Sequence, residues 1–344
     1  MAYTTINKSS LNFNTKPYTG NGGTNAQTGI NFKPDLTWIK TRTASGEGHH
    51  LYDVVRGVTK RLRSDTSAAE STVSTGLTAF GTDGFTVGNT AGVNGNGNGI
   101  ASWNWKAGSS FSNSAGANGA SIASTGSINT TAGFSIISYT GSGSNATVAH
   151  GLGVVPKMIL FKNRQATNSW RAAHNSIGWN KSLFLDNANS AQTEAYYNNT
   201  APTNQVFSIG SDGGTNGNNN NIIALCFAEK TGYSKINSYV GNSSENGTFC
   251  YCGFKPSFVI LKSSTSSEEW VMFDNKRLGF NPDNNALIAS SNSTEATDND
   301  IDFTAQGFKL RRNTGYVNDN GKIYIYMAFG QSIVGSNNIP ATAR

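Results

Sequence analysis

The stretch V-N-D-N-G-K-I-Y-I-Y-M-A-F, residues 317–329, decides the fold because the chain contains this arrangement three times. Its counterparts are V-N-G-N-G-N-G-I-A-S-W-N-W at residues 93–105 and T-N-G-N-N-N-N-I-I-A-L-C-F at residues 215–227. In each copy the closing aromatic residue lies eleven positions after the first asparagine. Because Asn-Gly favours tight turns and the following run is rich in strand formers, each copy predicts a β-hairpin.

A second motif recurs with the first and shows that the repetition is larger than one turn. A proline precedes a lysine by six positions at Pro34–Lys40, Pro156–Lys162 and Pro256–Lys262. From that proline to the turn asparagine the distance is 60, 60 and 62 residues. Two spacings kept in three copies indicate an internal repeat. The apolar residues before each lysine do not alternate with polar ones, which predicts a strand covered on both faces. We expect the lysine to return the chain to water.

The composition is that of an all-β protein. Only 13% of the residues are charged, 36% are hydrophobic, and 39 are glycine. No apolar pattern of helical period is sustained, and turn residues recur between short apolar runs. We therefore predict an all-β chain built from three tandem β-sandwich or jelly-roll-like repeat units.

The markers also give the domain boundaries. Unit 1 is expected over residues 1–107, unit 2 over 132–230 and unit 3 over 231–330. Between units 1 and 2 the glycine-, serine- and asparagine-rich residues 108–131 predict a flexible linker. Units 2 and 3 are joined by only a few residues and should pack as a rigid pair. Residues 331–344 form a short C-terminal tail.

Charge and hydropathy argue against several partners. The formal net charge is +6, and the one dense basic run is R-G-V-T-K-R-L-R at residues 56–63. No nucleic-acid-binding motif accompanies it, so we interpret the run as a solvated loop or as ion-pair partners of Asp53 and Asp65. No segment approaches the roughly 18 apolar residues of a membrane span, and the polar N-terminus predicts no secretory signal. Three cysteines and four histidines without zinc-site spacing predict no metal and no cofactor.

Aromatic residues separate what the units share from what they do not. Trp170 and Trp270 each follow the motif lysine by eight positions, and this recurrence favours core packing. Unit 1 carries His49 and His50 in that region instead. A second group of aromatic residues has no counterpart in the other units and supplies the candidates for glycan binding, with core packing as the alternative: Trp179, Tyr196 and Tyr197.

An enzymatic role requires a catalytic constellation that the sequence does not display. A glycosidase needs two carboxylates about 5–10 Å apart. The acids considered are Asp53, Asp186, Glu194, Glu268, Glu269 and Asp274. None stands in a distinctive motif, and the units share no acid at a matched position. We therefore predict no catalytic residues and no enzymatic activity.

Several segments together resemble a family of repeat modules in structural proteins of tailed bacteriophages, especially phages of marine and freshwater bacteria. The resembling segments are M-A-Y-T-T-I-N-K-S, N-F-K-P-D-L-T-W-I-K, V-V-R-G-V-T-K-R-L, G-L-T-A-F-G-T-D-G-F-T-V-G and A-S-W-N-W-K-A-G in unit 1, and G-F-K-P-S-F-V-I-L-K, Q-G-F-K-L, I-Y-I-Y-M-A-F and N-N-I-P-A-T-A-R from unit 3 onward. The resemblance covers most of the chain and brings no catalytic residues with it.

The resemblance implies a non-enzymatic virion protein, assembled in the host cytoplasm and displayed as a tail or head fibre or as capsid decoration. Its implied partners are other virion proteins and further copies of itself, with a trimer favoured. One alternative is a lectin-like adhesin that recognises a host surface polysaccharide. A second is a polysaccharide depolymerase.

Overall fold

The computed structural model describes residues 4–277, 281 and 283–334, and it confirms the predicted all-β, sandwich-like class. Strands account for nearly all of its regular structure. The helices are single turns: α1 (Ala91–Asn94), α2 (Gly213–Asn216), η1 (Ser9–Leu11), η2 (Ala117–Gly119) and η3 (Asn175–Ile177). Of the tail expected at 331–344, residues 335–344 lie outside the described part.

One strand order recurs in the main sheet of each unit. In unit 1 the order is β1 (Phe13–Thr19), β9 (Gly99–Trp105), β3 (Leu36–Thr41) and β4 (His50–Asp53). In unit 2 it is β12 (Phe134–Thr140), β19 (Asn221–Phe227), β14 (Met158–Asn163) and β15 (Arg171–His174). In unit 3 it is β20 (Ser234–Val240), β27 (Ile323–Gln331), β22 (Lys255–Ser263) and β23 (Val271–Asp274). All pairings in these sheets are antiparallel.

A smaller layer covers the outer face of each main sheet. It consists of β2 (Asn25–Gln27), β8 (Gly84–Val87) and β7 (Leu77–Gly81) in unit 1, β13 (Ala146–Ala149) and β18 (Val206–Ile209) in unit 2, and β24 (Asp283–Ile288), β25 (Ala296–Thr304), β26 (Gly307–Leu310) and β21 (Phe249–Tyr251) in unit 3. In unit 3 the pairing of β23 with β24 joins this layer to the main sheet. Two further pairs of short strands form two-stranded ribbons: β5 (Lys60–Arg61) with β6 (Ser71–Thr72), and β16 (Lys181–Ser182) with β17 (Gln192–Thr193). A separate apolar cluster fills each sandwich.

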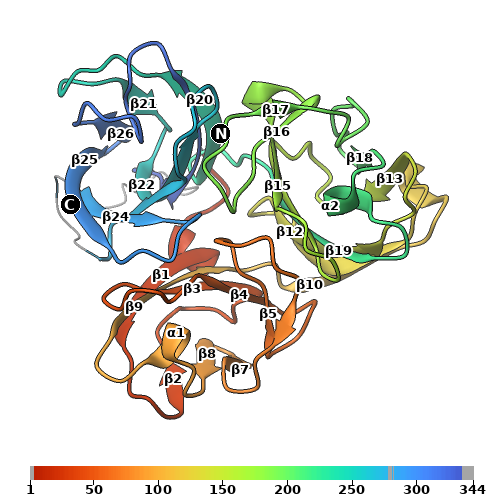
Figure 1. The fold of residues 1–344 in the computed structure, drawn as a ribbon, viewed down its shortest axis with the longest axis horizontal. Coiled ribbons are helices and arrows are strands. Elements are labelled where there is room, and N and C mark those ends of the chain that lie inside the picture. The colour runs from red at the N-terminus through yellow and green to blue at the C-terminus, as the bar shows by residue number, and fades with distance from the viewer. Residues whose placement is uncertain (1–3, 278–280, 282, 335–344) are drawn as a thin grey trace.

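The inner faces of the three main sheets meet in one shared core, around which the units are arranged as three lobes (Figure 1). The closing aromatic residues of the recurring stretch form a triangle there. Ring centroids are 6.4 Å apart for Trp105 and Phe227, 6.1 Å for Phe227 and Phe329, and 5.9 Å for Trp105 and Phe329. Each main sheet is therefore buried on both faces, which explains the apolar runs without alternation.

The recurring stretch is not a hairpin, so that prediction is wrong. Its strand pairs with two strands far earlier in the chain, as β9 does with β1 and β3. The turn asparagines Asn94, Asn216 and Asn318 have no positive φ; each N–H instead donates to the carbonyl four residues back, as in a helix. The left-handed residue comes three positions later, at Gly97, Asn219 and Gly321.

The side chains of these asparagines hold the end of the unit's first strand. Each is fully buried. The side-chain oxygens of Asn94, Asn216 and Asn318 accept from the N–H of Asn21, Ser142 and Asn242 at 2.9, 2.7 and 3.0 Å, and their amide groups donate to the carbonyls of Gly23, Ser144 and Ser244 at 2.7, 2.6 and 2.8 Å. Asparagine recurs here because its amide satisfies a donor and an acceptor of the same loop.

We expected the motif lysines to return the chain to water, and this prediction is wrong. Lys40, Lys162 and Lys262 are all fully buried, and each ammonium donates to backbone carbonyls of its own unit and of one neighbouring unit. The acceptors in the neighbouring unit are the carbonyls of Asn292 at 3.4 Å, Ser67 at 2.7 Å and Ala188 at 3.1 Å, respectively. Unit 1 thus contacts unit 3, unit 2 contacts unit 1, and unit 3 contacts unit 2. Burial lowers the pKa of each lysine to about 8.

A second set of hydrogen bonds follows the same cycle. The indole N–H of Trp170 donates to the carbonyl of Arg63, and that of Trp270 to the carbonyl of Phe184, both at 2.7 Å. In unit 1 the ring of His49 takes this place, with Nε2 lying 2.9 Å from the carbonyl of Ile288. The predicted core position of the two tryptophans is confirmed.

Residues 108–131, expected to be a flexible linker, are instead an ordered part of unit 2. They contain β10 (Ser109–Asn113) and β11 (Ser124–Asn129), and β11 pairs with β12 along its length. Composition predicted flexibility because glycine and serine lose much entropy on ordering. The open edge of β12 compensates by offering a continuous row of hydrogen-bond partners.

Replacing Lys162 by methionine tests the lysine cycle. The variant keeps the volume but leaves the carbonyls of Ser67 and Asn168 without their donor. We expect the free energy of unfolding to fall by roughly 2–3 kcal/mol, because buried acceptors lose a charged donor. Urea unfolding measures it. Lys33→Met, at an exposed lysine, should change stability by less than about 0.5 kcal/mol. An equal effect of both substitutions would contradict the proposed role.

Candidate functional site

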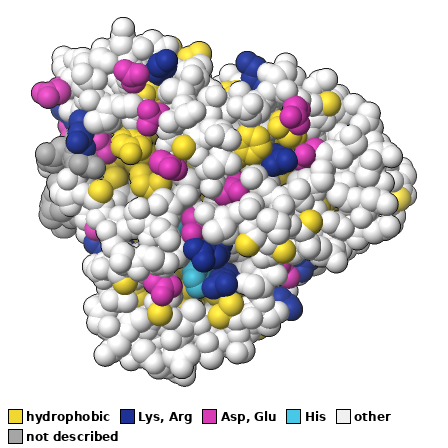
Figure 2. All heavy atoms as spheres, in the orientation of Figure 1, with side chains coloured by type: hydrophobic (Ala, Val, Ile, Leu, Met, Phe, Trp, Pro, Cys, Tyr) yellow, Lys and Arg dark blue, Asp and Glu magenta, His cyan; other side chains and the backbone are white. Residues whose placement is uncertain are grey.

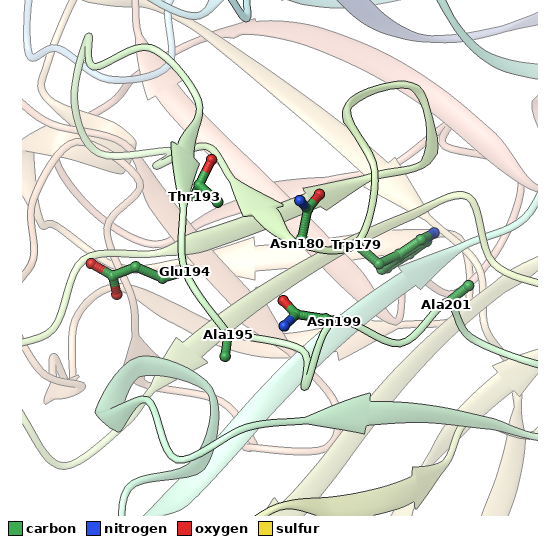
Figure 3. A pocket seen from close by; sticks show the side chains of 7 residues that line it. All are labelled: Trp179, Asn180, Thr193, Glu194, Ala195, Asn199 and Ala201. Carbon is green, nitrogen blue, oxygen red and sulfur yellow. The ribbon is translucent and has the colours of Figure 1, made fainter.

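A hollow lies on the surface of unit 2, where the sequence placed its glycan-binding candidates. Its volume is about 580 Å³. The residues around it are Trp179, Asn180, Thr193, Glu194, Ala195, Asn199 and Ala201. Figure 3 shows the side chains of Asn180 and Asn199 near the middle, Trp179 on one side, Thr193 on the other, and the Glu194 carboxylate pointing away from them.

Short local elements position these side chains. Gly178 has a φ of 80° and turns the chain from η3 into Trp179. β16 and β17 then pair, and the N–H of Glu194 extends the pairing by donating to the carbonyl of Asn180 at 3.1 Å. Asn199 lies on a turn with a φ of 49°, a conformation that asparagine tolerates better than most residues. The hollow is therefore built on paired strands and one tight turn.

Of the three predicted glycan-binding residues, only Trp179 borders the hollow. Tyr197 is buried, stacks on Phe161 at 5.5 Å, and shares a 2.8 Å hydrogen bond with the Ser182 hydroxyl. Tyr196 is also buried. Neither tyrosine ring is accessible to a ligand. Both tyrosines belong to the core, which was the alternative to glycan binding. Trp179 itself is only 9% exposed.

A stacked arginine supports this region, and sequence reasoning did not identify it. Arg171 lies 5.0 Å from the ring centroids of both Phe184 and Tyr196. Its guanidinium donates to both oxygens of Asp212, at 3.1 and 2.8 Å. Burial raises the pKa of Tyr196 to about 12. In the sequence, only its place directly after the recurring Trp170 could have identified Arg171.

The basic run of unit 1 is divided between the interior and the surface. Arg56 is buried and pairs with Asp53 and, at 3.1 Å, with Glu70. Arg63 pairs with Asp65 at 2.5 Å. The interpretation of these arginines as ion-pair partners of Asp53 and Asp65 is confirmed.

Figure 2 shows that the face in view consists mostly of uncharged polar and backbone atoms, with the charged side chains dispersed.

The candidate acids are dispersed as well. Asp53 and Asp274 are buried in ion pairs with the arginines three residues later. They stand at matched positions of β4 and β23, so the prediction that the units share no acid at a matched position is wrong. Asp186 accepts from the N–H of Trp170 at 3.1 Å, and Glu194 borders the hollow. Within the described residues, no three His, Cys, Asp or Glu side chains gather as a metal site would require. In the same part of the chain, no helix has the length and apolarity needed to cross a membrane.

Comparison with known proteins gives one match. The model of a family described only as a domain of unknown function, DUF7483, matches residues 8–332. The chain belongs to the DUF7483 family. The matched range begins just before η1 and ends after β27, so a single DUF7483 domain includes all three lobes and their shared core. No curated protein and no solved structure matches the chain.

Three of the four histidines of this DUF7483 protein are held neutral in a common way. In His49, His150 and His174 the Nδ1 atom accepts an N–H, from Trp38, Leu152 and Ser176, respectively. The Nε2 atom therefore carries the proton and faces a backbone carbonyl. Burial lowers the pKa of His49 to about 3 and that of His150 and His174 to about 4. A second proton would place two donors against each other.

These lowered pKa values predict acid sensitivity. The unfolded chain takes up protons on histidine below about pH 6.5, whereas the folded protein does so only near pH 3–4. The stabilisation is therefore complete above about pH 6.5 and is lost as the pH falls through that window. Urea unfolding between about pH 7 and pH 5 should show it. His174→Gln, which keeps a donor and an acceptor, should reduce the slope of the free energy of unfolding against pH. An unchanged slope would contradict the assignment.

Proposed function

We propose that this protein is a non-enzymatic structural component of a tailed-phage particle, displayed as a tail or head fibre or as capsid decoration. The resemblance of its segments to phage structural modules supports this function. The structural observation that carries it is the cycle of buried contacts between units, made by Lys40, Lys162 and Lys262. A particle protein must keep its shape outside the cell, and such a cycle opposes the opening of any single unit.

Ion pairs reinforce two of the three contacts between units. Glu70 accepts from Arg56 of its own unit and from Arg164 of unit 2. Glu295 likewise accepts from Arg277 of its own unit and from Arg42 of unit 1, at 2.7–2.8 Å. Neighbouring arginines lower the pKa of both glutamates, which stay ionised. These bridges favour one fixed arrangement of the units over alternatives that would leave a buried charge unpaired.

The partners proposed with this function are other virion proteins and further copies of the chain, with a trimer favoured. Mass spectrometry of purified particles, followed by gold-labelled antibody in electron microscopy, tests the proposal. We expect the chain in the particle at a regular position on its outer surface. Its absence from purified particles that carry the other structural proteins would overturn the proposal. The position of the label would separate tail from capsid.

Glycan recognition is the second candidate, favoured by the hollow beside Trp179. An indole edge next to the exposed amides of Asn180 and Asn199 offers the apolar contact and hydrogen bonds that saccharides require. No arginine or lysine is among the described residues that line the hollow, which favours a neutral sugar over an acidic one. The third function considered, depolymerisation of a polysaccharide, would show as release of new reducing ends.

A glycan array followed by affinity measurement tests the second candidate. We expect Trp179→Ala to weaken binding of a neutral surface glycan by at least about tenfold, equal to about 1.4 kcal/mol. Tyr316→Ala, at an aromatic residue of unit 3 that is 45% exposed, is the matched control and should have no effect. Absence of binding across microbial surface glycans, or the same loss in both variants, would remove glycan recognition from consideration.

A further inference from the structure

The outer strand of the small layer is covered in unit 2. β13 pairs with β18 on one side, and the segment of residues 119–124 lies along its other side. The N–H groups of Ser121 and Ile122 donate to the carbonyl of Thr147 at 3.0 and 3.2 Å, and the N–H of Thr147 donates to the Ser121 hydroxyl at 2.8 Å. Ala149 is only 2% exposed and packs in an apolar cluster with Ala120. The strand thus has partners on both edges.

The matching strand of unit 3 is β21, and its register identifies the equivalent residues. Cys250 lies opposite Phe308 of β26, as Val148 lies opposite Phe207 of β18. Phe249 and Tyr251 therefore take the places of Thr147 and Ala149. In Figure 1, β21 lies beside β26 in the lobe of unit 3, as β13 lies beside β18 in that of unit 2.

The outward edge of β21 is unoccupied in the described part of the chain. Leu310 donates its N–H to the carbonyl of Thr248, and Cys252 donates to that of Gln306, so alternate residues face β26. Phe249, between them, directs its N–H and carbonyl the other way, and neither has a hydrogen-bond partner among the described residues. In unit 2 the same two groups, those of Thr147, are bonded to residues 121 and 122.

This open edge is also apolar. Phe249 is 47% exposed, Tyr251 is 60% exposed and Val240 is 53% exposed. The Thr248 hydroxyl donates to the carbonyl of Val240 at 2.8 Å, which holds the end of β20 beside β21. Unit 1 has no such feature, because Ala26 and Thr28 stand at the two aromatic positions. Two aromatic side chains at an unpaired strand edge are specific to unit 3.

We propose that the β21 edge of unit 3 binds an extended segment of a partner protein by strand addition, in the way that residues 119–124 cover β13. The backbone of Phe249 would supply the hydrogen bonds, and the rings of Phe249 and Tyr251 would flank the added strand. The partner segment has small, uncharged side chains with an isolated apolar residue, like A-N-G-A-S-I-A-S at residues 117–124. This surface is independent of the proposed virion function.

Among its described residues, unit 3 has no segment of its own that corresponds to residues 119–124 of unit 2. Between β19 and β20 lie only residues 228–233. They span at most about 20 Å when fully extended, and the carbonyl of Lys230 is already bonded to the N–H groups of Tyr233 and Ser234. Residues 108–131 perform this role in unit 2 and are held there by β11.

The test uses a synthetic peptide of residues 117–124 with both ends blocked, titrated into the isotope-labelled full chain. We expect saturable binding, with the largest amide chemical-shift changes at Phe249 and Tyr251. Phe249→Pro removes the edge N–H, and Tyr251→Ser removes one flanking ring while leaving the backbone intact. Each should weaken binding at least about tenfold. Ala26→Pro, at the equivalent position of unit 1, is the matched control and should leave binding unchanged.

Three outcomes would overturn the proposal. One is no binding at millimolar peptide, and another is binding with shift changes away from β21. The third is self-association of the protein, abolished by Tyr251→Ser, without peptide binding; the occupant would then be a second copy of the chain. Thermal unfolding of each variant establishes that unit 3 is folded, and Tyr251→Ser keeps the test valid if Phe249→Pro unfolds it.

Discussion

The triangle of Trp105, Phe227 and Phe329 is the constraint on which the rest of the structure depends. Ring contacts of about 6 Å require that the central strands of three sheets approach a common point, which buries the inner face of every main sheet. The polar groups of that face and its margins then lose contact with water. A buried polar group without a partner is costly, so most of these groups bond to a donor or acceptor inside the protein. The indole N–H of Trp105 is an exception and has no partner among the described residues.

At the margins of the shared core, the lysine cycle supplies hydrogen-bond partners for buried backbone carbonyls. Each ammonium reaches the backbone of a neighbouring unit, so a lysine of one unit satisfies a carbonyl of another. Trp170, Trp270 and His49 do the same with a ring N–H. Histidine serves where tryptophan stands elsewhere because, once Trp38 donates to Nδ1, Nε2 becomes a donor at a similar position. A chemical role is conserved between units although the residue type is not.

The units differ mainly where they do not face the shared core. Two of the three contacts between units carry an arginine–glutamate–arginine bridge, whereas the third has Ser264 and Ala191 at the corresponding places, joined by a backbone hydrogen bond of 3.0 Å. Unit 2 has a hollow beside Trp179 and a covered β13 edge. Unit 3 leaves the equivalent edge open, with aromatic residues on it. Residues that serve the shared core are thus separated from residues that give each unit its own surface.

The sequence by itself determined the all-β class, the recurring stretch and the core position of Trp170 and Trp270, because strand propensity and fixed spacing are local properties of the chain. Tertiary structure alone decided the strand partners of β9, the order of residues 108–131 and the burial of Lys40, Tyr196 and Tyr197. Each of these features depends on which distant segment of the chain packs against the residue. Composition indicates whether a segment tolerates exposure to solvent, but only the packing of distant strands determines whether the segment is exposed.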